Sequence, residues 1–300
     1  MNKQINVGLA GKVKLVAVNA ETGEERLLAD WFDNLITDGG LNRMGTDQHG
    51  NYCLVGSGST PPANTDTALT TFIASTNNYT PTVGAASSAP YYGWELYKYR
   101  FNQGAAAGNI SEIGIGWTAT NGNLFARTLV KDSGGNPTTV TVLANEYLDV
   151  FHELRIYAPT SDVTTQVTIA GVVHDVIVRP SYVTYGYSGR WAASRGDAIR
   201  IGSGISSTAY AGTIGAQTTG PSGSSGLFTS TTMSAYVNNS LKRTAVLSAA
   251  LDVCNVGGIR SIEFGTRGAG SWQMQFTPAI AKDNTKTLSL TVEVSWARRP

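Results

Sequence analysis

The chain has 300 residues, of which 41% are hydrophobic and 14% are charged, whereas an ordinary soluble domain has about 25% charged residues. This low charge excludes a coiled coil. The 6 Trp, 13 Tyr and 8 Phe residues exclude full disorder, because such side chains need burial. The formal net charge is +1, and no stretch approaches the about 18 consecutive apolar residues of a membrane span. We therefore expect no nucleic-acid partner and no membrane insertion.

Strand patterns dominate the chain. Residues 12–18 and 24–32 flank a loop that contains glycine, which predicts a hairpin. A helix of one or two turns at most is expected within residues 34–44, where Asp38 is a possible cap and Gly39-Gly40 weakens the pattern. Further strands are expected, in chain order, over residues 91–101, 110–117, 124–130, 138–143 and 148–157. The turn cluster at 158–162 is the preferred domain boundary.

The second half of the sequence resembles the first half. Four matches occur in the same order, and both copies of the last one keep an apolar face with a period of two, as a half-buried strand requires. The matched segments are 55–58 with 201–204, 110–116 with 259–265, 125–132 with 276–283, and 148–157 with 288–297.

We therefore predict an all-β protein with two tandem, duplicated β-sandwich domains of jelly-roll-like type, long loops and little helix. The N-terminal domain spans residues 1–160, and the C-terminal domain, a diverged internal repeat, spans 161–300. Each copy carries a long polar insertion after its Gly-Ser-Gly string, at 59–90 and at 205–230. Loops of this length are usually functional or bound to a partner, and both a neighbouring subunit and a ligand are possible partners.

Motifs for metal binding and catalysis are missing from the sequence. His49, His152 and His174 have no ligand spacing, and no Cys-x-x-Cys occurs, so we expect no metal site and no cofactor. His152 falls on the inward face of its strand, which favours a buried, hydrogen-bonded side chain. Cys53 and Cys254 do not occupy equivalent positions in the repeat, so reduced, buried thiols are favoured over a disulfide.

Carboxylates are sparse as well. Glu21, Glu24 and Glu25 cluster at a hairpin tip, which is typical of a solvated loop. A glycosidase needs two carboxylates that converge on one bond, and the sequence singles out no such pair. A nucleophile elbow and a phosphate-binding loop are also missing. We therefore expect no enzymatic activity.

Aromatic clusters are the remaining candidates for a functional surface. Rings load both faces of the strand at 91–101, so this strand is expected to be buried against its own core and against a second domain or subunit. A second cluster at 182–191 mixes rings with small polar residues, which suits a binding surface. Ordinary strand residues, a subunit contact and sugar stacking are the three interpretations. The candidate contact residues are Tyr91, Trp94, Tyr97, Tyr99, Tyr182, Tyr185, Tyr187 and Trp191.

The first half of the sequence also resembles a known family. Residues 34–41 read Asn-Leu-Ile-Thr-Asp-Gly-Gly-Leu, which is similar to an N-x-I-T-x-x-G-L element of tailed-bacteriophage tail proteins. Residues 54–69 continue the likeness, which covers most of residues 30–157 and includes the strands at 110–117, 124–136 and 148–157. The matching segments are strands and turns, so the resemblance implies no catalytic residues.

The resemblance implies a non-enzymatic structural component of a bacteriophage tail, of tail-fibre, baseplate or adaptor type. Such a protein is located in the virion tail and is synthesised in the host cytoplasm, which agrees with the lack of a signal-peptide pattern in residues 1–6. Its expected partners are further copies of itself, with a trimer or hexamer favoured, and other tail proteins. One alternative is a receptor-binding protein that recognises a host-surface glycan or protein through residues 182–191 or the loop tips. A third interpretation is a carbohydrate-active enzyme.

Overall fold

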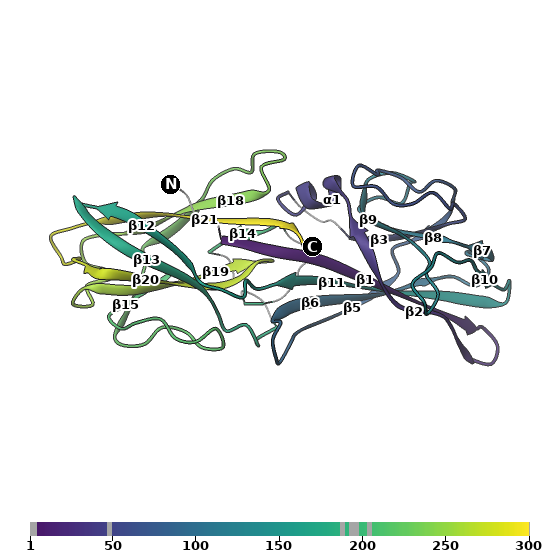
Figure 1. Cartoon of the computed structure of the whole chain (residues 1–300), viewed down its shortest axis with the longest axis horizontal. Coiled ribbons are helices and arrows are strands. Elements are labelled where there is room, and N and C mark those ends of the chain that lie inside the picture. Colours follow the sequence, from purple (N-terminus) through teal and green to yellow (C-terminus); the bar gives the residue numbers. More distant parts are fainter. Residues whose placement is uncertain (1–4, 47–49, 187–189, 192–197, 203–205, 300) are drawn as a thin grey trace.

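The computed structural model describes residues 5–46, 50–186, 190–191, 198–202 and 206–299. Over these residues the chain consists of β-strands and one short helix, α1 (Asp38–Arg43) (Figure 1). The strands of the first half are β1 (Ile5–Asn19), β2 (Glu25–Ile36), β3 (Tyr52–Gly56), β4 (Phe72–Thr76), β5 (Tyr79–Ala85), β6 (Tyr92–Phe101), β7 (Gly108–Ile110), β8 (Glu112–Gly116), β9 (Leu124–Leu129), β10 (Val140–Val142) and β11 (Glu146–Tyr157). The strands of the second half are β12 (Val163–Ile169), β13 (Val172–Ser181), β14 (Arg200–Ile201), β15 (Thr208–Tyr210), β16 (Ser225–Leu227), β17 (Ser230–Met233), β18 (Lys242–Ala249), β19 (Ile259–Arg267), β20 (Gly270–Ile280) and β21 (Leu288–Arg298).

Strand β1 lies at the centre of the largest sheet. Along one edge it pairs antiparallel with β11, from Gly8 opposite Tyr157 to Asn19 opposite Glu146. Along the other edge it pairs antiparallel with β2 and, near its start, parallel with β21. Beyond β11 the sheet continues through β6 to β5. Every part of this sheet is therefore connected through β1.

Strand β2 changes its partner along its length. Up to Asn34 it pairs with β1, whereas Leu35 and Ile36 pair with β9. Strands β8, β3 and β4 follow β9 in order. Buried side chains from the strands around β1 and from the strands around β9 belong to one core cluster, which includes Leu154 of β11 and Ile115 of β8. The sheet therefore curls back on itself around this core.

The second half contributes to two sheets. Strands β12, β13, β20, β19, β15 and β16 follow one another in a separate sheet, with β14 also paired to β19. Strands β17, β18 and β21 instead extend the sheet of β1, because Ile5–Leu9 pairs with Val294–Arg298. This pair is parallel, whereas the other strand pairs of the described residues are antiparallel.

The all-β class with little helix is confirmed, and so is the hairpin of β1 and β2. Two separate sandwiches are not seen, since β18 and β21 lie in the same sheet as β1. The boundary near residue 160 falls between β11 and β12 and stays a prediction. The helix is capped by Thr37 rather than Asp38, because the Thr37 hydroxyl accepts a hydrogen bond of 2.8 Å from the Gly40 N–H.

Helix α1 and the turn after it connect the two halves of the molecule. The Trp296 indole of β21 donates a hydrogen bond of 2.7 Å to the Leu41 carbonyl. The Ile199 N–H donates to the Met44 carbonyl at 2.8 Å, and Arg243 of β18 donates to the Gly45 carbonyl. These contacts and the β1–β21 pair hold the elongated molecule together at its middle (Figure 1).

The long polar segment of the first half is attached to the sheet by a buried carboxylate. Glu112 of β8 is fully buried and accepts hydrogen bonds from the N–H groups of Gly58, Thr70 and Thr71, at 3.0, 3.1 and 2.7 Å. Its counter-charge is the Arg127 guanidinium at 2.7 Å. Burial alone would raise the pKa of Glu112, but the Thr71 and Thr70 N–H groups and Arg127 outweigh it and hold this pKa below its usual value.

The corresponding segment of the second half is attached by a neutral amide. Gln273 of β20 is fully buried, and its Nε2 lies within hydrogen-bond distance of the carbonyls of Pro180, Gly215 and Ala216, at 3.1, 3.2 and 3.0 Å. Its Oε1 accepts a hydrogen bond of 2.8 Å from the Gly215 N–H. Both long polar segments also contain strands, β4 and β5 in the first and β15 and β16 in the second. They are therefore less irregular than the sequence suggested.

Candidate functional site: an aromatic and basic sheet face

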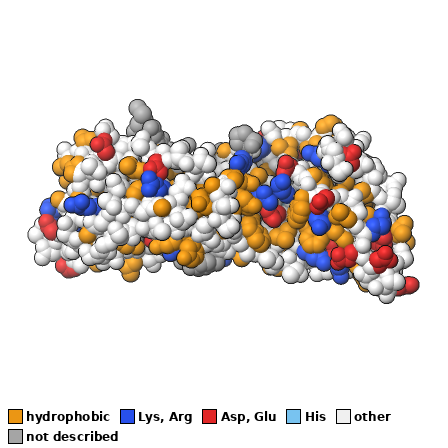
Figure 2. All heavy atoms as spheres, turned by 60° about the horizontal axis from the view of Figure 1, so that its bottom comes forward, with side chains coloured by type: hydrophobic (Ala, Val, Ile, Leu, Met, Phe, Trp, Pro, Cys, Tyr) orange, Lys and Arg blue, Asp and Glu red, His pale blue; other side chains and the backbone are white. Residues whose placement is uncertain are grey.

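One face of the sheet formed by β5, β6, β11, β1 and β2 points away from the core and carries aromatic and basic side chains. Alternate residues of a strand point to opposite faces, and the register of β11 with β1 and β6 brings the outward residues into rows. Figure 2 shows charged and hydrophobic side chains gathered over the half of the molecule that contains β2, β5 and β6. The aromatic–basic face consists of Lys12, Lys14, Trp31, Tyr92, Trp94, Lys98, Phe151, Arg155, Tyr157 and Arg299, all half-buried or exposed.

Cations hold the rings of this face in place. The Arg155 guanidinium lies 4.6 Å from the centre of the Tyr92 ring, and the Arg299 guanidinium lies 3.7 Å from the centre of the Tyr157 ring. The two tyrosine rings are 4.8 Å apart. Each cation–ring contact at an exposed site contributes about 0.5–1 kcal/mol. These contacts therefore fix the orientation of both tyrosine rings.

Phe151 and Trp94 extend the ordered surface. Lys14 and Lys98 lie 5.9 and 5.5 Å from the centre of the Phe151 ring, on the strands to either side of it. The Trp94 indole lies across β5 at Gly84, where a Cβ would collide with the ring. Gly84 is therefore needed for Trp94 to lie flat over the neighbouring strand.

The cations of the face have acidic neighbours at its edges and beneath it. Asp149 is almost completely buried and pairs with Lys98 and Arg100 at 2.8 and 2.6 Å. Its hydrogen bond raises the pKa of Arg100 above the usual value. Arg155 pairs with Glu153 at 2.5 Å. These pairs fix the cations, so that the surface offers flat rings together with oriented N–H donors.

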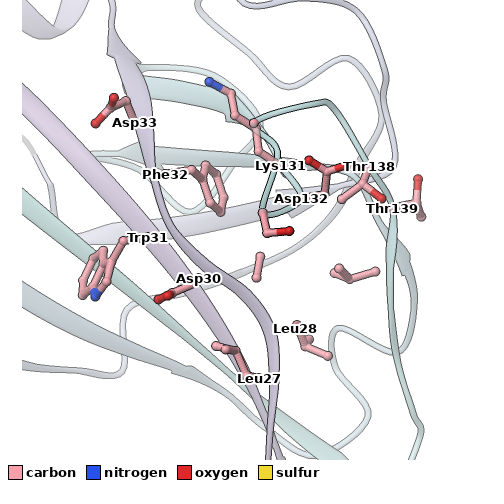
Figure 3. A pocket seen from close by; sticks show the side chains of 14 residues that line it. Leu27, Leu28, Asp30, Trp31, Phe32, Asp33, Lys131, Asp132, Thr138 and Thr139 are labelled. Atoms are coloured by element: carbon pink, nitrogen blue, oxygen red, sulfur yellow. The ribbon is translucent and has the colours of Figure 1, made fainter.

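A basic pocket lies at one end of the face, where β2 and β21 separate from β1. Its volume is about 470 Å³, and its wall includes the basic side chains Lys12, Arg155, Arg298 and Arg299 together with Tyr157. A larger hollow of about 750 Å³ runs along β2. Figure 3 shows that Trp31 and Phe32 border this hollow on β2, opposite residues 131–139.

The structure separates the predicted contact residues of β6 and the residue before it. Trp94 lies on the aromatic–basic face, and Tyr91 is half-buried against the core. Tyr97 and Tyr99 are only 5% and 0% exposed and belong to the core cluster, so their expected role as contact residues is corrected to one in packing. The reason is the period of two, because 97 and 99 share the inward face while 92 and 94 share the outward one.

The second predicted cluster is also divided between core and surface. Trp191 is 1% exposed, its ring lies 5.6 Å from that of Trp272, and its indole donates to the Ser181 carbonyl. The prediction that Trp191 lies on a binding surface is therefore wrong, because the side chain is part of the core. Tyr182 is half-buried, Tyr185 is 47% exposed, and Tyr187 lies outside the described residues.

Two smaller predictions are confirmed. His152 is buried, and its Nε2 lies 3.0 Å from the Asn34 amide nitrogen. Cys53 and Cys254 are free and buried, and burial raises the pKa of the Cys254 thiol.

In the part of the chain that the structure describes, no group of three or more His, Cys, Asp or Glu side chains could hold a metal ion. No helix within that part is long and apolar enough to cross a membrane.

The sequence analysis missed most of the aromatic–basic face. Its signal lies in residues 151–157, where the outward positions of the strand are Phe151, Glu153, Arg155 and Tyr157. The inward apolar positions of the same strand predict only that β11 is half-buried.

Comparison of the chain with protein-family models, with curated proteins and with solved structures found no match.

Proposed function

We propose that the chain is a non-enzymatic structural component of a bacteriophage tail, of tail-fibre or adaptor type, which assembles with further copies of itself and with other tail proteins. The observation that carries self-assembly is the aromatic–basic face, whose rings are held by cations across three adjacent strands. Aromatic residues and arginine are enriched where protein surfaces meet. The phage context comes from the resemblance of residues 30–157, and with it the virion tail as location and the host cytoplasm as site of synthesis.

We also propose that the two halves are diverged copies of one β-sandwich unit. Four strand pairs of the first half have counterparts in the same order in the second. They are β1·β2 and β12·β13, β2·β9 and β13·β20, β8·β9 and β19·β20, and β6·β11 and β18·β21. The halves also differ: β21 pairs with β1, where the repeat would place β12, and the pairs β7·β10 and β15·β16 each occur in one half only among the described residues. The two copies are therefore two domains that share strand β1, which pairs with β11 of the first copy and with β21 of the second.

The mass of the purified chain in solution, measured by light scattering after size exclusion, tests the assembly. We expect a trimer or hexamer. The variant Trp94→Ser should lower the mass, because it removes a flat ring from the contact surface. Val237→Ser is the matched control, since Val237 is 69% exposed and lies outside the face. A chain that stays monomeric and never assembles with tail proteins would overturn the proposal.

One observation favours a second candidate function, recognition of a host receptor. Tyr185 is 47% exposed, and the Arg190 guanidinium lies 3.6 Å from the Tyr182 ring centre and 5.7 Å from that of Tyr185. An exposed ring beside an ordered guanidinium suits a glycan. Labelled protein should then decorate host cells, and Tyr185→Ala should abolish the decoration without lowering the melting temperature. A lack of decoration by the unmodified protein would remove this candidate.

A further inference from the structure

The tip of the β1–β2 hairpin is an ordered acidic projection. The Asn19 side chain accepts hydrogen bonds from the N–H groups of Glu21 and Thr22, at 2.9 and 3.0 Å. Glu21, Glu24 and Glu25 are exposed and form no ion pair with another described residue. The tip projects from one end of the molecule, beyond the body of the sheet (Figure 1). We call residues 19–25 the acidic tip.

The basic pocket has the opposite charge. Four cations and one carboxylate, Asp33, line it. Three of the cations are paired: Lys12 with Asp33 at 3.4 Å, Arg155 with Glu153 at 2.5 Å and Arg298 with Asp38 at 2.5 Å. The guanidinium of Arg299 stacks on Tyr157 and forms no ion pair with a described residue. Each guanidinium carries five N–H donors, so the pocket retains donors that a carboxylate from outside could use.

The tip and the pocket of one copy cannot meet. Both lie on the β1–β2 hairpin, with Lys12 in the wall of the pocket and Thr22 at the tip. A strand rises about 3.3 Å per residue, so the seven residue steps along β1 from Lys12 to Asn19 alone place them more than about 20 Å apart. The carboxylates of the tip can reach such a pocket only on another copy of the chain.

We propose that the acidic tip of one copy inserts into the basic pocket of a second copy. This inference rests on the self-assembly proposed above and names the surfaces that carry it. Carboxylate–arginine pairs form short, charge-assisted and often bidentate hydrogen bonds. The tip is already ordered by Asn19, so it loses little freedom on insertion. Because tip and pocket are different surfaces, each copy in a closed ring offers one of each.

The test exchanges the charges of the two surfaces. In the tip variant, Glu24→Arg and Glu25→Arg are combined; the pocket variant is Arg299→Glu. Light scattering of the full chain should show that each variant alone dissociates, with a rise of about 30-fold or more in the dissociation constant. A chain that carries both sets of changes should assemble again, because the arginines of the tip then meet the carboxylate introduced by Arg299→Glu, while the other cations of the pocket stay paired. High salt should weaken the native contact as well.

The matched controls are Asp252→Arg and Arg260→Glu, exposed residues of the second half that make the same kinds of charge change elsewhere. They should leave the mass unchanged, and circular dichroism should show that all variants are folded. An oligomer whose mass is unaffected by the tip and pocket variants would overturn this inference and leave self-assembly standing. Loss of assembly that the combined variant does not restore would also overturn it. A monomeric unmodified chain would overturn self-assembly itself.

Discussion

The two halves of the molecule hold their long polar segments with different chemistry. In the first half, the ionised side chains of Glu112 and Arg127 are both almost completely buried. Glu112 accepts hydrogen bonds from N–H groups of the segment, and Arg127 donates to the Thr60 carbonyl and the Thr70 hydroxyl. In the second half, the neutral amide of Gln273 binds mainly the carbonyl groups of the segment. Each half therefore fixes its long segment to a strand, the first through an ion pair and the second through a neutral amide.

The difference has consequences for stability. A buried ion pair offsets the cost of removing two charges from water only while both partners are present. A buried amide carries no net charge. Its loss leaves neutral backbone N–H and carbonyl groups without a partner, which costs less than an unpaired buried charge. The charged anchor should therefore be the more sensitive of the two, both to substitution and to pH.

The largest effect is expected for Arg127→Met. The change leaves Glu112 buried without its counter-charge, which costs about 3–5 kcal/mol. Urea unfolding measures the loss. The control is Lys286→Met, which removes the exposed pair with Asp283 and should leave the free energy of unfolding almost unchanged. Equal effects of the two variants would contradict the role of Glu112 and Arg127 as a buried anchor.

A smaller effect is expected for Gln273→Leu. The leucine fills most of the space but leaves the Gly215 N–H and several carbonyls without the amide, which costs about 1–3 kcal/mol. The same urea experiment applies. Gln166→Leu, at an exposed position, should stay close to the unmodified protein. A cost for Gln273→Leu above that of Arg127→Met would reverse the comparison.

Acid should loosen the first anchor and spare the second. The pKa of Glu112 is lower in the folded chain than in the unfolded one, so its contribution is complete above about pH 4.3. It is lost as the pH falls below that value through the folded pKa. Hydrogen exchange should therefore show that the Thr70 and Thr71 amides lose protection between pH 5 and pH 2 before the Gly215 amide does (about the range in which carboxylates titrate). Simultaneous loss would argue against separate anchors.

The smallest effect concerns alkaline pH in the second half. Burial and the negative charge of Glu263 raise the pKa of Tyr210 to about 12. A tyrosine with a raised folded pKa contributes stability below its unfolded pKa of about 10 and loses that contribution as the pH rises to the folded value. Tyr210→Phe should flatten the decline of the melting temperature above pH 10 (about the unfolded pKa). An unchanged decline would mean that other groups control it.

Local patterns in the sequence predict a good part of the fold. The alternation at 148–157 predicts strand β11 and the burial of His152, because a period of two assigns each side chain to one face. The partner of β21 could not be predicted in this way. Its parallel pairing joins Ile5 to Val294, and the sequence contains no local signal for a contact between strands so far apart.

The candidate site was less accessible to sequence analysis than the fold. The pattern of β6 shows that Trp94 and Tyr97 point to opposite faces, but the packing of the sheets decides which face is inside. Trp191 lies outside a regular strand, so no period indicates its burial. The basic partners of the rings come from three strands, which only the assembled sheet brings together.

The parallel pair of β1 and β21 also determines how the molecule responds to tension. The chain enters β1 at Ile5 and leaves β21 at Arg298, and the two strands run in the same direction. A pull on the two chain ends therefore acts along the strand axis in opposite directions. The five residue pairs between the strands resist such a pull together, in shear, rather than opening one after another like a zipper. Strand β1 passes the load on to β11 and β2, so the strongest resistance to stretching should lie at the middle of the molecule.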